Sequence, residues 1–453
     1  MPPRTPRLDV PELALVLLVG AAGSGKSTFA RAHFGPYEAV SSDACRGMVA
    51  NDPNDQTSTA DAFALLHHVV ALRLARGLLT VVDATNVQPE ARRPLLALAR
   101  RHHVPAVAIV LDLPERVCQA RNAARVDRQV GVHVVAHQHA QLRRALPGLP
   151  REGFAAVYLL YDEDAIAAAT VVRQPLASNR TGDHGPFDII GDVHGCADEF
   201  EALLARLGYL PDADADSDGV CAWRHPAGRT AVFVGDLADR GPRVPDAFRI
   251  AIGMVAARTA LAVPGNHDVK LLKALRGQTV QRTHGLAQSL EQLDATTPAL
   301  RARIVEFVDT LPSHYVLDGG RLVVAHAGLT AELQGRSSGK VRAFALYGQT
   351  TGESDEFGLP VRYAWAADYR GRAAVVYGHT PVATPVWLNE TIDIDTGCVF
   401  GGRLTALRWP ERELVSVPAL RQYAEPRRPF LPSPHTSQTH AGPASGEDAG
   451  PAA

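Results

Sequence analysis

Five short segments in the second half of the chain place Asp, Asn or His where a β-rich run ends. They are GDVHG (191–195), GDLADRG (235–241), GNHD (265–268), VVAHAG (323–328) and GHTP (378–381). Asp192 and His194, two residues apart on an extended chain, point the same way, as paired metal ligands must. Oxygen and imidazole ligands without thiolates suit Mn, Fe, Zn or Ni. We therefore interpret the segments as a site for two divalent ions, with Mn²⁺ the expected metal.

The pattern also suggests how the ligands are shared. Asp192 and His194 would bind one ion, and Asp236 would bridge to the other. A second set would complete the other ion's shell: Asn266, His326 and His379. Such a pair, about 3.5 Å apart, clamps a phosphoryl group for in-line attack. Two further residues would contact phosphate and assist the leaving group: Arg240 and His267. For any single histidine a structural role is the simpler interpretation, but five motifs in order favour a metal site.

The first half of the chain contains a different phosphate-handling segment, GAAGSGKST (20–28), between a predicted strand and a predicted helix. It satisfies G-x-x-x-x-G-K-[ST], whose glycines let backbone amides converge on phosphate oxygens. Lys26 would reach the β- and γ-phosphates, and Ser27 would bind Mg²⁺. The expected ligand is ATP or another nucleoside triphosphate with Mg²⁺, held by Gly20, Gly23, Gly25, Lys26, Ser27 and Thr28.

Asp43, in SSDACR, follows the segment expected to form the second strand of this sheet. Its carboxylate could accept the proton of an attacking hydroxyl, and Arg46 could hold the acceptor's phosphate. The sequence equally supports Asp43 as a helix cap and Arg46 as a surface charge. Asp83, at a third strand end, is a candidate partner for the magnesium.

Three arginines share one face of a predicted helix in RNAARVDRQV, at i, i+4 and i+7: Arg121, Arg125 and Arg128. A solvated face is the commoner explanation for such a stripe. No acidic residue interrupts it, which favours a lid that closes over a triphosphate.

The elements that must position these residues fall into two α/β domains. From Leu13 to about Leu160, apolar runs alternate with helical stretches, which predicts a parallel sheet with helices on both faces. We expect a P-loop kinase domain over 1–175, a linker over 176–186, a second, strand-rich α/β domain over 187–426 and a disordered tail over 427–453.

The composition fits an intracellular enzyme rather than a secreted or membrane protein. The chain has 453 residues, a net charge of −2 and five scattered cysteines, so nucleic acid would be bound by a local patch and disulfides are not expected. The apolar run LALVLLV leads into the glycine-rich segment and is better explained as a buried strand than as a signal peptide. We expect a cytoplasmic protein without membrane contact.

With these motifs, residues 187 to about 400 resemble the calcineurin-like binuclear metallophosphoesterases, which implies an α/β sandwich for the domain over 187–426. The whole from about 15 to 418 resembles bacterial polynucleotide kinase-phosphatases that heal RNA ends. The resemblance implies phosphorylation of 5′-hydroxyl ends, with Asp43 as base and Arg46 as clamp. It also implies removal of 2′,3′-cyclic, 2′- or 3′-phosphates from RNA, or DNA, ends.

Two departures from the family patterns matter. GHTP lacks the second histidine of G-H-x-H, and the resemblance implies that Asp395 in DIDTG replaces it. No K-x-D-G lysine motif follows the phosphatase segment, so a separate ligase, and with it an RNA-end methyltransferase, are the expected partners. GHTP and DIDTG are also close to dinucleoside tetraphosphate hydrolases and Ser/Thr protein phosphatases. A nucleotide-clearing or signalling hydrolase, fused to a small-molecule kinase, is therefore the alternative.

Overall fold

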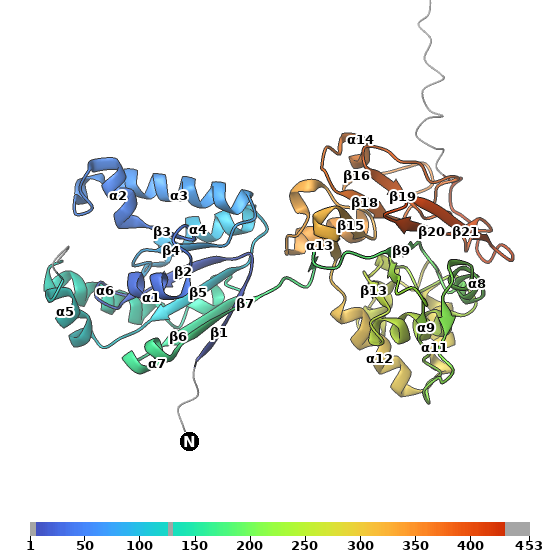
Figure 1. The fold of residues 1–453 in the computed structure, drawn as a ribbon, viewed down its shortest axis with the longest axis horizontal. Coiled ribbons are helices and arrows are strands. Elements are labelled where there is room, and N and C mark those ends of the chain that lie inside the picture. Colours follow the sequence, from blue (N-terminus) through green and yellow to red (C-terminus); the bar gives the residue numbers. More distant parts are fainter. Residues whose placement is uncertain (1–5, 126–129, 431–453) are drawn as a thin grey trace, which may run out of the picture. The chain divides into compact units, whose positions relative to one another are not determined.

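The computed structural model describes residues 6–125 and 130–430. The chain divides into two compact units: the first contains the chain up to Leu176 together with Arg336–Gly339, and the second contains the other described residues from Ala177 onward. Figure 1 shows the first unit in blue to green and the second in green to red.

The first unit is built on a parallel sheet of five strands within the described residues. Their order is β3 (Ala39–Ser41), β4 (Thr80–Asp83), β2 (Leu15–Val19), β5 (Ala106–Leu111) and β6 (Ala156–Leu160). Alternate residues of β2 enter different apolar clusters, Leu17 on one face and Leu18 on the other. Since both faces of the central strand are covered, the predicted layered α/β architecture is confirmed.

Helices cover both faces of this sheet (Figure 1). They are α1 (Lys26–His33), α2 (Ser42–Ala50), α3 (Thr59–Ala75), α4 (Pro89–Arg101), α5 (Glu115–Ala123), α6 (Val132–Ala145) and α7 (Glu163–Ala168). A short parallel pair not predicted from the sequence, β1 (Arg7–Pro11) with β7 (Thr170–Gln174), joins the two ends of the unit.

The second unit is a sandwich of two five-stranded sheets in the described part of the chain. One has the order β13 (Ala260–Ala262), β12 (Thr230–Phe233), β9 (Phe187–Ile190), β20 (Arg403–Trp409), β21 (Glu413–Pro418). The other has the order β19 (Thr391–Asp393), β18 (Ala374–Tyr377), β15 (Leu322–Ala325), β14 (His314–Leu317), β8 (Asn179–Arg180). Ile189 and Val232 of the first sheet share one apolar cluster with Val324 and Val376 of the second. The predicted sandwich is confirmed.

Each outer face of the sandwich is covered by helices. Phe233 of the first sheet packs in one cluster with Phe200 and Phe248, and Val375 of the second packs with Phe344. The helices are α8 (Ala197–Leu207), α9 (Val244–Ala256), α10 (Asn266–Leu275), α11 (Leu286–Asp294), α12 (Pro298–Thr310), α13 (Gly339–Tyr347) and α14 (Trp365–Asp368). Two small hairpins complete the unit: β10 (Leu210–Pro211) with β11 (Trp223–Arg224), and β16 (Thr350–Ser354) with β17 (Pro360–Arg362).

Two segments differ from the expectations drawn from their composition. The predicted linker contains β8, whose residues pair with Val316 and Leu317 at the sheet edge, because even a turn-rich segment can satisfy backbone groups along an open strand. Residues 427–430, predicted to begin a disordered tail, line a pocket. The ring of Phe430 packs against Phe400, which gives this segment apolar surface to bury. Residues 431–453 lie outside the described residues.

Candidate active sites

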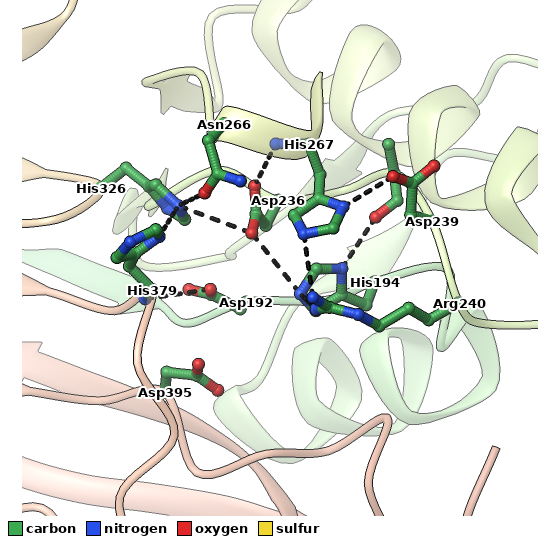
Figure 2. Close-up of polar contacts among 12 residues, drawn as sticks. Asp192, His194, Asp236, Asp239, Arg240, Asn266, His267, His326, His379 and Asp395 are labelled. Carbon is green, nitrogen blue, oxygen red and sulfur yellow. Dashed lines mark hydrogen bonds and ion pairs between the residues drawn. The ribbon is translucent and has the colours of Figure 1, made fainter. Parts of the chain in front are cut away.

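The predicted metal ligands converge at one edge of the sandwich, because each follows the carboxyl end of a strand (Figure 2). The strands and the ligands that follow them are β9 with Asp192 and His194, β12 with Asp236, β13 with Asn266, β15 with His326, β18 with His379 and β19 with Asp395. The Nε2 atoms of His194 and His326 both lie 3.5 Å from Asp236 Oδ2. Asp236 thus occupies the central position that the bridging assignment requires.

Backbone carbonyls orient two of these imidazoles. His194 Nδ1 lies 2.8 Å from the oxygen of Ala238, and His326 Nδ1 lies 3.0 Å from that of Val234. Because a carbonyl only accepts hydrogen bonds, each Nδ1 carries the proton and each Nε2 presents a lone pair to the centre. His326 Nε2 lies 3.0 Å from both Asn266 Oδ1 and His379 Nδ1.

The acidic groups of the centre are buried together and require positive charge. Burial, and then the neighbouring carboxylates of Asp395 and Asp236, raises the pKa of Asp192 well above its usual range. Burial also raises the pKa of Asp395 to about 6. Asp192 Oδ1 is buried and has no hydrogen-bond partner among the described residues, while Asp192 Oδ2 accepts from the backbone N–H of His379. An oxygen and imidazole donor set with an unpartnered buried carboxylate oxygen fits divalent ions.

The backbone is strained where it presents several of these side chains. His194, Asp236 and His379 have φ values of 45°, 50° and 79°, in the left-handed region that favours glycine. Each such residue costs about 1–3 kcal/mol and persists only where the surrounding structure enforces it. Strain at three ligands indicates that the fold, rather than local preference, fixes their positions.

His267 and Arg240, the predicted phosphate contacts, lie on one side of Asp236 (Figure 2). Arg240 Nη2 donates to His267 Nε2 at 2.9 Å, and its Nη1 contacts His194 Nε2. His267 Nδ1 donates to Asp239 Oδ2 at 2.6 Å, and Ser289 Oγ donates to the other oxygen of this buried carboxylate. Asp239 was missed in the sequence, although it stands beside Arg240 in GDLADRG.

A pocket of about 590 Å³ opens beside this centre. Besides Asp236, Arg240 and His379, it is lined by Arg362, which sequence patterns did not single out. Arg362 lies in β17, and its Nη2 is 2.7 Å from His379 Nε2. No motif surrounds Arg362, so only the fold reveals it.

The glycine-rich segment of the first unit forms the expected strand–loop–helix turn after β2. Gly25 immediately precedes α1 with φ 93°, and at Gly23 an added Cβ would lie 2.1 Å from the carbonyl oxygen of Cys118. Lys26 Nζ donates to the oxygens of Gly20 and Ala21, each at 2.8 Å. Two residues of the motif, Ser27 and Thr28, are exposed in the first turn of α1. The backbone geometry fits a phosphate cradle.

Asp43 and Arg46 form an ion pair of 2.8 Å, and the Arg46 side chain is only 4% exposed. Ser41, rather than Asp43, caps α2, because its Oγ accepts from the backbone N–H of Asp43 and Ala44. The interpretations of Asp43 as a cap and Arg46 as a surface charge are therefore wrong. Burial lowers the pKa of Lys26 in the phosphate loop, and the charges of Asp83 and Asp43 are close enough to oppose this effect.

The predicted arginine stripe is not one helical face, because α5 ends at Ala123 and Arg125 lies beyond it. Arg121 Nη1 would lie 3.3 Å from a Cβ added at Gly25, and Arg125 is close enough to lower the pKa of Lys26. Arg121 also pairs with Glu163 at 2.8 Å. Arg128 lies outside the described residues, so its role in a lid stays a prediction.

Two family models match the chain: the AAA domain over residues 15–149 and the calcineurin-like phosphoesterase over residues 185–383. Among curated proteins, the chain is 49% identical over 249 residues to a bis(5′-nucleosyl)-tetraphosphatase PrpE (asymmetrical) from Anoxybacillus flavithermus, covering 54% of this chain and 99% of that protein. It is 45% identical over 245 residues to the protein of the same name from Bacillus subtilis, covering 53% of this chain and 98% of the relative.

These findings establish a P-loop AAA domain fused to a metallophosphoesterase domain. Among the described residues, no helix has the length and apolar character needed to cross a bilayer.

Proposed function

The chain belongs to the calcineurin-like phosphoesterase family through its second unit, and from that premise we propose that it heals broken RNA ends. The first unit would transfer the γ-phosphate of ATP, with Mg²⁺, to a 5′-hydroxyl. The second would remove a 2′,3′-cyclic, 2′- or 3′-phosphate. Both steps prepare one break for a separate ligase and an RNA-end methyltransferase, which explains why opposite chemistries share a chain.

The observation that carries this proposal is the Asp43–Arg46 pair at the end of β3. A buried arginine paired with a half-exposed carboxylate beside the phosphate loop suits an acceptor that brings both a hydroxyl and a phosphate. In the transfer, the acceptor oxygen bonds to the γ-phosphorus, its proton passes to the Asp43 carboxylate, and ADP leaves. A small-molecule acceptor without a phosphate would not need Arg46.

At the second site, Asp192, His194 and Asp395 would hold one ion, Asn266, His326 and His379 the other, and Asp236 both. Bound divalent ions, for which we propose Mn²⁺, would polarise the phosphoryl oxygens and neutralise their charge. Arg240 would direct its guanidinium at the same phosphoryl group and bind one of its oxygens. Asp239 orients the His267 ring through its hydrogen bond with Nδ1. The Nε2 atom of His267 would then contact the leaving oxygen.

A second candidate is hydrolysis of dinucleoside tetraphosphates, favoured by the 49% identity to the Anoxybacillus tetraphosphatase. One experiment separates the two. An RNA oligonucleotide with a 5′-hydroxyl and a 2′,3′-cyclic phosphate is incubated with the protein, ATP and Mg²⁺ or Mn²⁺, and both ends are read by mass spectrometry. Phosphate gained at one end and lost at the other supports end healing. Two unchanged ends, with cleavage of diadenosine tetraphosphate in a parallel reaction, would overturn it.

A further inference from the structure

One wall of the metal-site pocket comes from chain beyond the last strand, β21. This segment, Tyr423–Phe430, contributes every one of its residues to the lining of the 590 Å³ cavity. Arg240, Arg362 and Phe400 also line this cavity. The pocket is therefore larger than a phosphate requires, and the additional space faces this segment.

Specific hydrogen bonds fix where the segment begins. The backbone N–H groups of Tyr423 and Ala424 both donate to the oxygen of Val399 at 3.0 Å. The buried carboxylate of Glu199, on α8, accepts from the hydroxyl of Tyr423 and from the backbone N–H of Leu420, each at 2.8 Å. These bonds hold the segment next to Phe400 at the edge of the pocket.

The segment adds positive charge where the pocket already holds some. Arg427 and Arg428 join Arg362 and Arg240 in the lining. Arg362 and Arg428 line the same cavity, close enough for their positive charges to interact. Asp355 Oδ2 lies 3.5 Å from Arg428 Nη1, and Glu425 is the carboxylate that the segment itself adds to the lining. Such a cluster suits an anion with more than one phosphate.

The same wall offers aromatic surface. The rings of Phe400 and Phe430 lie 6.3 Å apart between centroids, and the Arg240 guanidinium lies over the Phe400 ring at 5.1 Å. Nucleobases stack on aromatic rings and guanidinium planes without regard to sequence.

We propose that Tyr423–Phe430 forms, with Arg362 and Phe400, a subsite for the part of the substrate beyond the reacting phosphate: a nucleoside that bears at least one further phosphate. This inference rests on the proposed phosphoesterase activity and assigns its substrate class. Arg362 and Arg428 bind the additional phosphate, and Phe400 and Phe430 contact the base. A polynucleotide 3′ end and a dinucleoside polyphosphate share this chemistry.

The test compares Arg428→Ala and Phe430→Ala with Arg421→Ala, an exposed arginine just upstream that lies outside the pocket lining. KM is measured with Mn²⁺ for three substrates: a 3′-phosphorylated oligonucleotide, diadenosine tetraphosphate and p-nitrophenyl phosphate. We expect the ratio of the nucleotide KM to the p-nitrophenyl phosphate KM to rise about tenfold in the first two variants, as for loss of one charge-assisted hydrogen bond in Arg428→Ala and of one stacking contact in Phe430→Ala. Arg421→Ala leaves the ratio unchanged.

A KM ratio that rises for the oligonucleotide assigns the nucleoside to a polynucleotide 3′ end. A ratio that rises for diadenosine tetraphosphate assigns it to a dinucleoside polyphosphate. An unchanged ratio for both nucleotide substrates, or an equal change in Arg421→Ala, overturns the subsite. Failure of the proposed activity is seen separately, as absence of metal-dependent p-nitrophenyl phosphate hydrolysis by the unmodified protein. In that event, calorimetric binding of diadenosine tetraphosphate is measured in a Lys26→Ala background. Weaker binding by Arg428→Ala than by Arg421→Ala supports the subsite, and equal binding refutes it.

Discussion

The two sites of this chain are built in opposite ways. The phosphate loop is one continuous segment, Gly20–Thr28, in which the backbone itself is the ligand and glycines allow its turn. The metal centre gathers side chains from Asp192 to Asp395, one or two from each of several strand ends. Its ligands meet only when both sheets of the sandwich are paired.

This difference determines how each site tolerates change. A phosphate loop depends on a local conformation that its own sequence favours, with Gly25 in a left-handed conformation that costs glycine little. The metal centre holds His194, Asp236 and His379 in that same region against their preference. We therefore expect ions to contribute to the stability of the second unit much more than nucleotide contributes to that of the first.

The largest effect should come from Asp236→Asn, which keeps the shape of the side chain and removes the shared charge. Hydrolysis of p-nitrophenyl phosphate should fall at least about a thousandfold in kcat/KM, because both ions lose a ligand. In the unmodified protein, removing ions with a chelator should lower the Tm of the second unit, and saturating Mn²⁺ should restore about 3 kcal/mol. The Asp236→Asn variant should show little of that response. Hydrolysis that survives the substitution would refute the bridging assignment.

The reciprocal change, Asp43→Ala, should reduce 5′-phosphorylation by about 10²–10⁴-fold, the range for loss of a general base, and leave hydrolysis in place. Radiolabel transfer from ATP to a 5′-hydroxyl oligonucleotide measures the loss. Asp61→Ala, an exposed acid in the first turn of α3, is the matched control and should keep full kinase activity. Unimpaired transfer in the Asp43 variant would show that another group accepts the proton.

Much of both sites could be predicted because their motifs directly follow strands. A strand followed by GAAGSGKST has one local structure, and a β-rich run ending in Asp or His places that residue at the sheet edge in any α/β fold. Asp395 required a resemblance, since DIDTG alone does not reveal its distance from Asp192. The layered fold of the first unit followed from the alternation of apolar runs, and the sandwich of the second was implied by the resemblance.

What could not be predicted depends on contacts across the chain. Arg362 lies in an exposed hairpin without a motif, and only its contact with His379 identifies it as a candidate site residue. Asp239 becomes a candidate site residue only because α10 presents His267 to it. Residues 427–430 look disordered by composition, and their position is explained by contacts of Phe430 with the Phe400 ring and of Arg428 with Asp355.

A smaller effect should follow from Asp239→Asn. The carboxylate accepts from His267 Nδ1, and an asparagine can present its amide N–H there instead, which removes the preference for one ring orientation. We expect kcat for phosphoester hydrolysis to fall about 10- to 100-fold, with KM changed less than twofold, because the substrate contacts remain. Ser289→Ala, which removes the bond to the other carboxylate oxygen, should have a weaker effect in the same direction. A rise in KM alone would contradict an orienting role.

The smallest effect concerns the phosphate loop and depends on pH. Burial lowers the pKa of Lys26 to about 8 in the free protein, despite the opposing charges of Asp83 and Asp43. Bound phosphates stabilise the ammonium and raise that pKa, so above pH 8 the protein must take up a proton to bind ATP with Lys26 charged. Affinity for ATP should therefore be constant below pH 8 and fall by up to about tenfold per pH unit above it. The terminal phosphate, with a pKa of about 6, stays ionised over this range.

Titration calorimetry from pH 7 to 9.5 measures the fall in ATP affinity. The variant Lys26→Met, which has no proton to lose, should bind ATP more weakly and with a flat pH profile. A flat profile in the unmodified protein would mean that the ammonium keeps its charge through the two carbonyl contacts to Gly20 and Ala21.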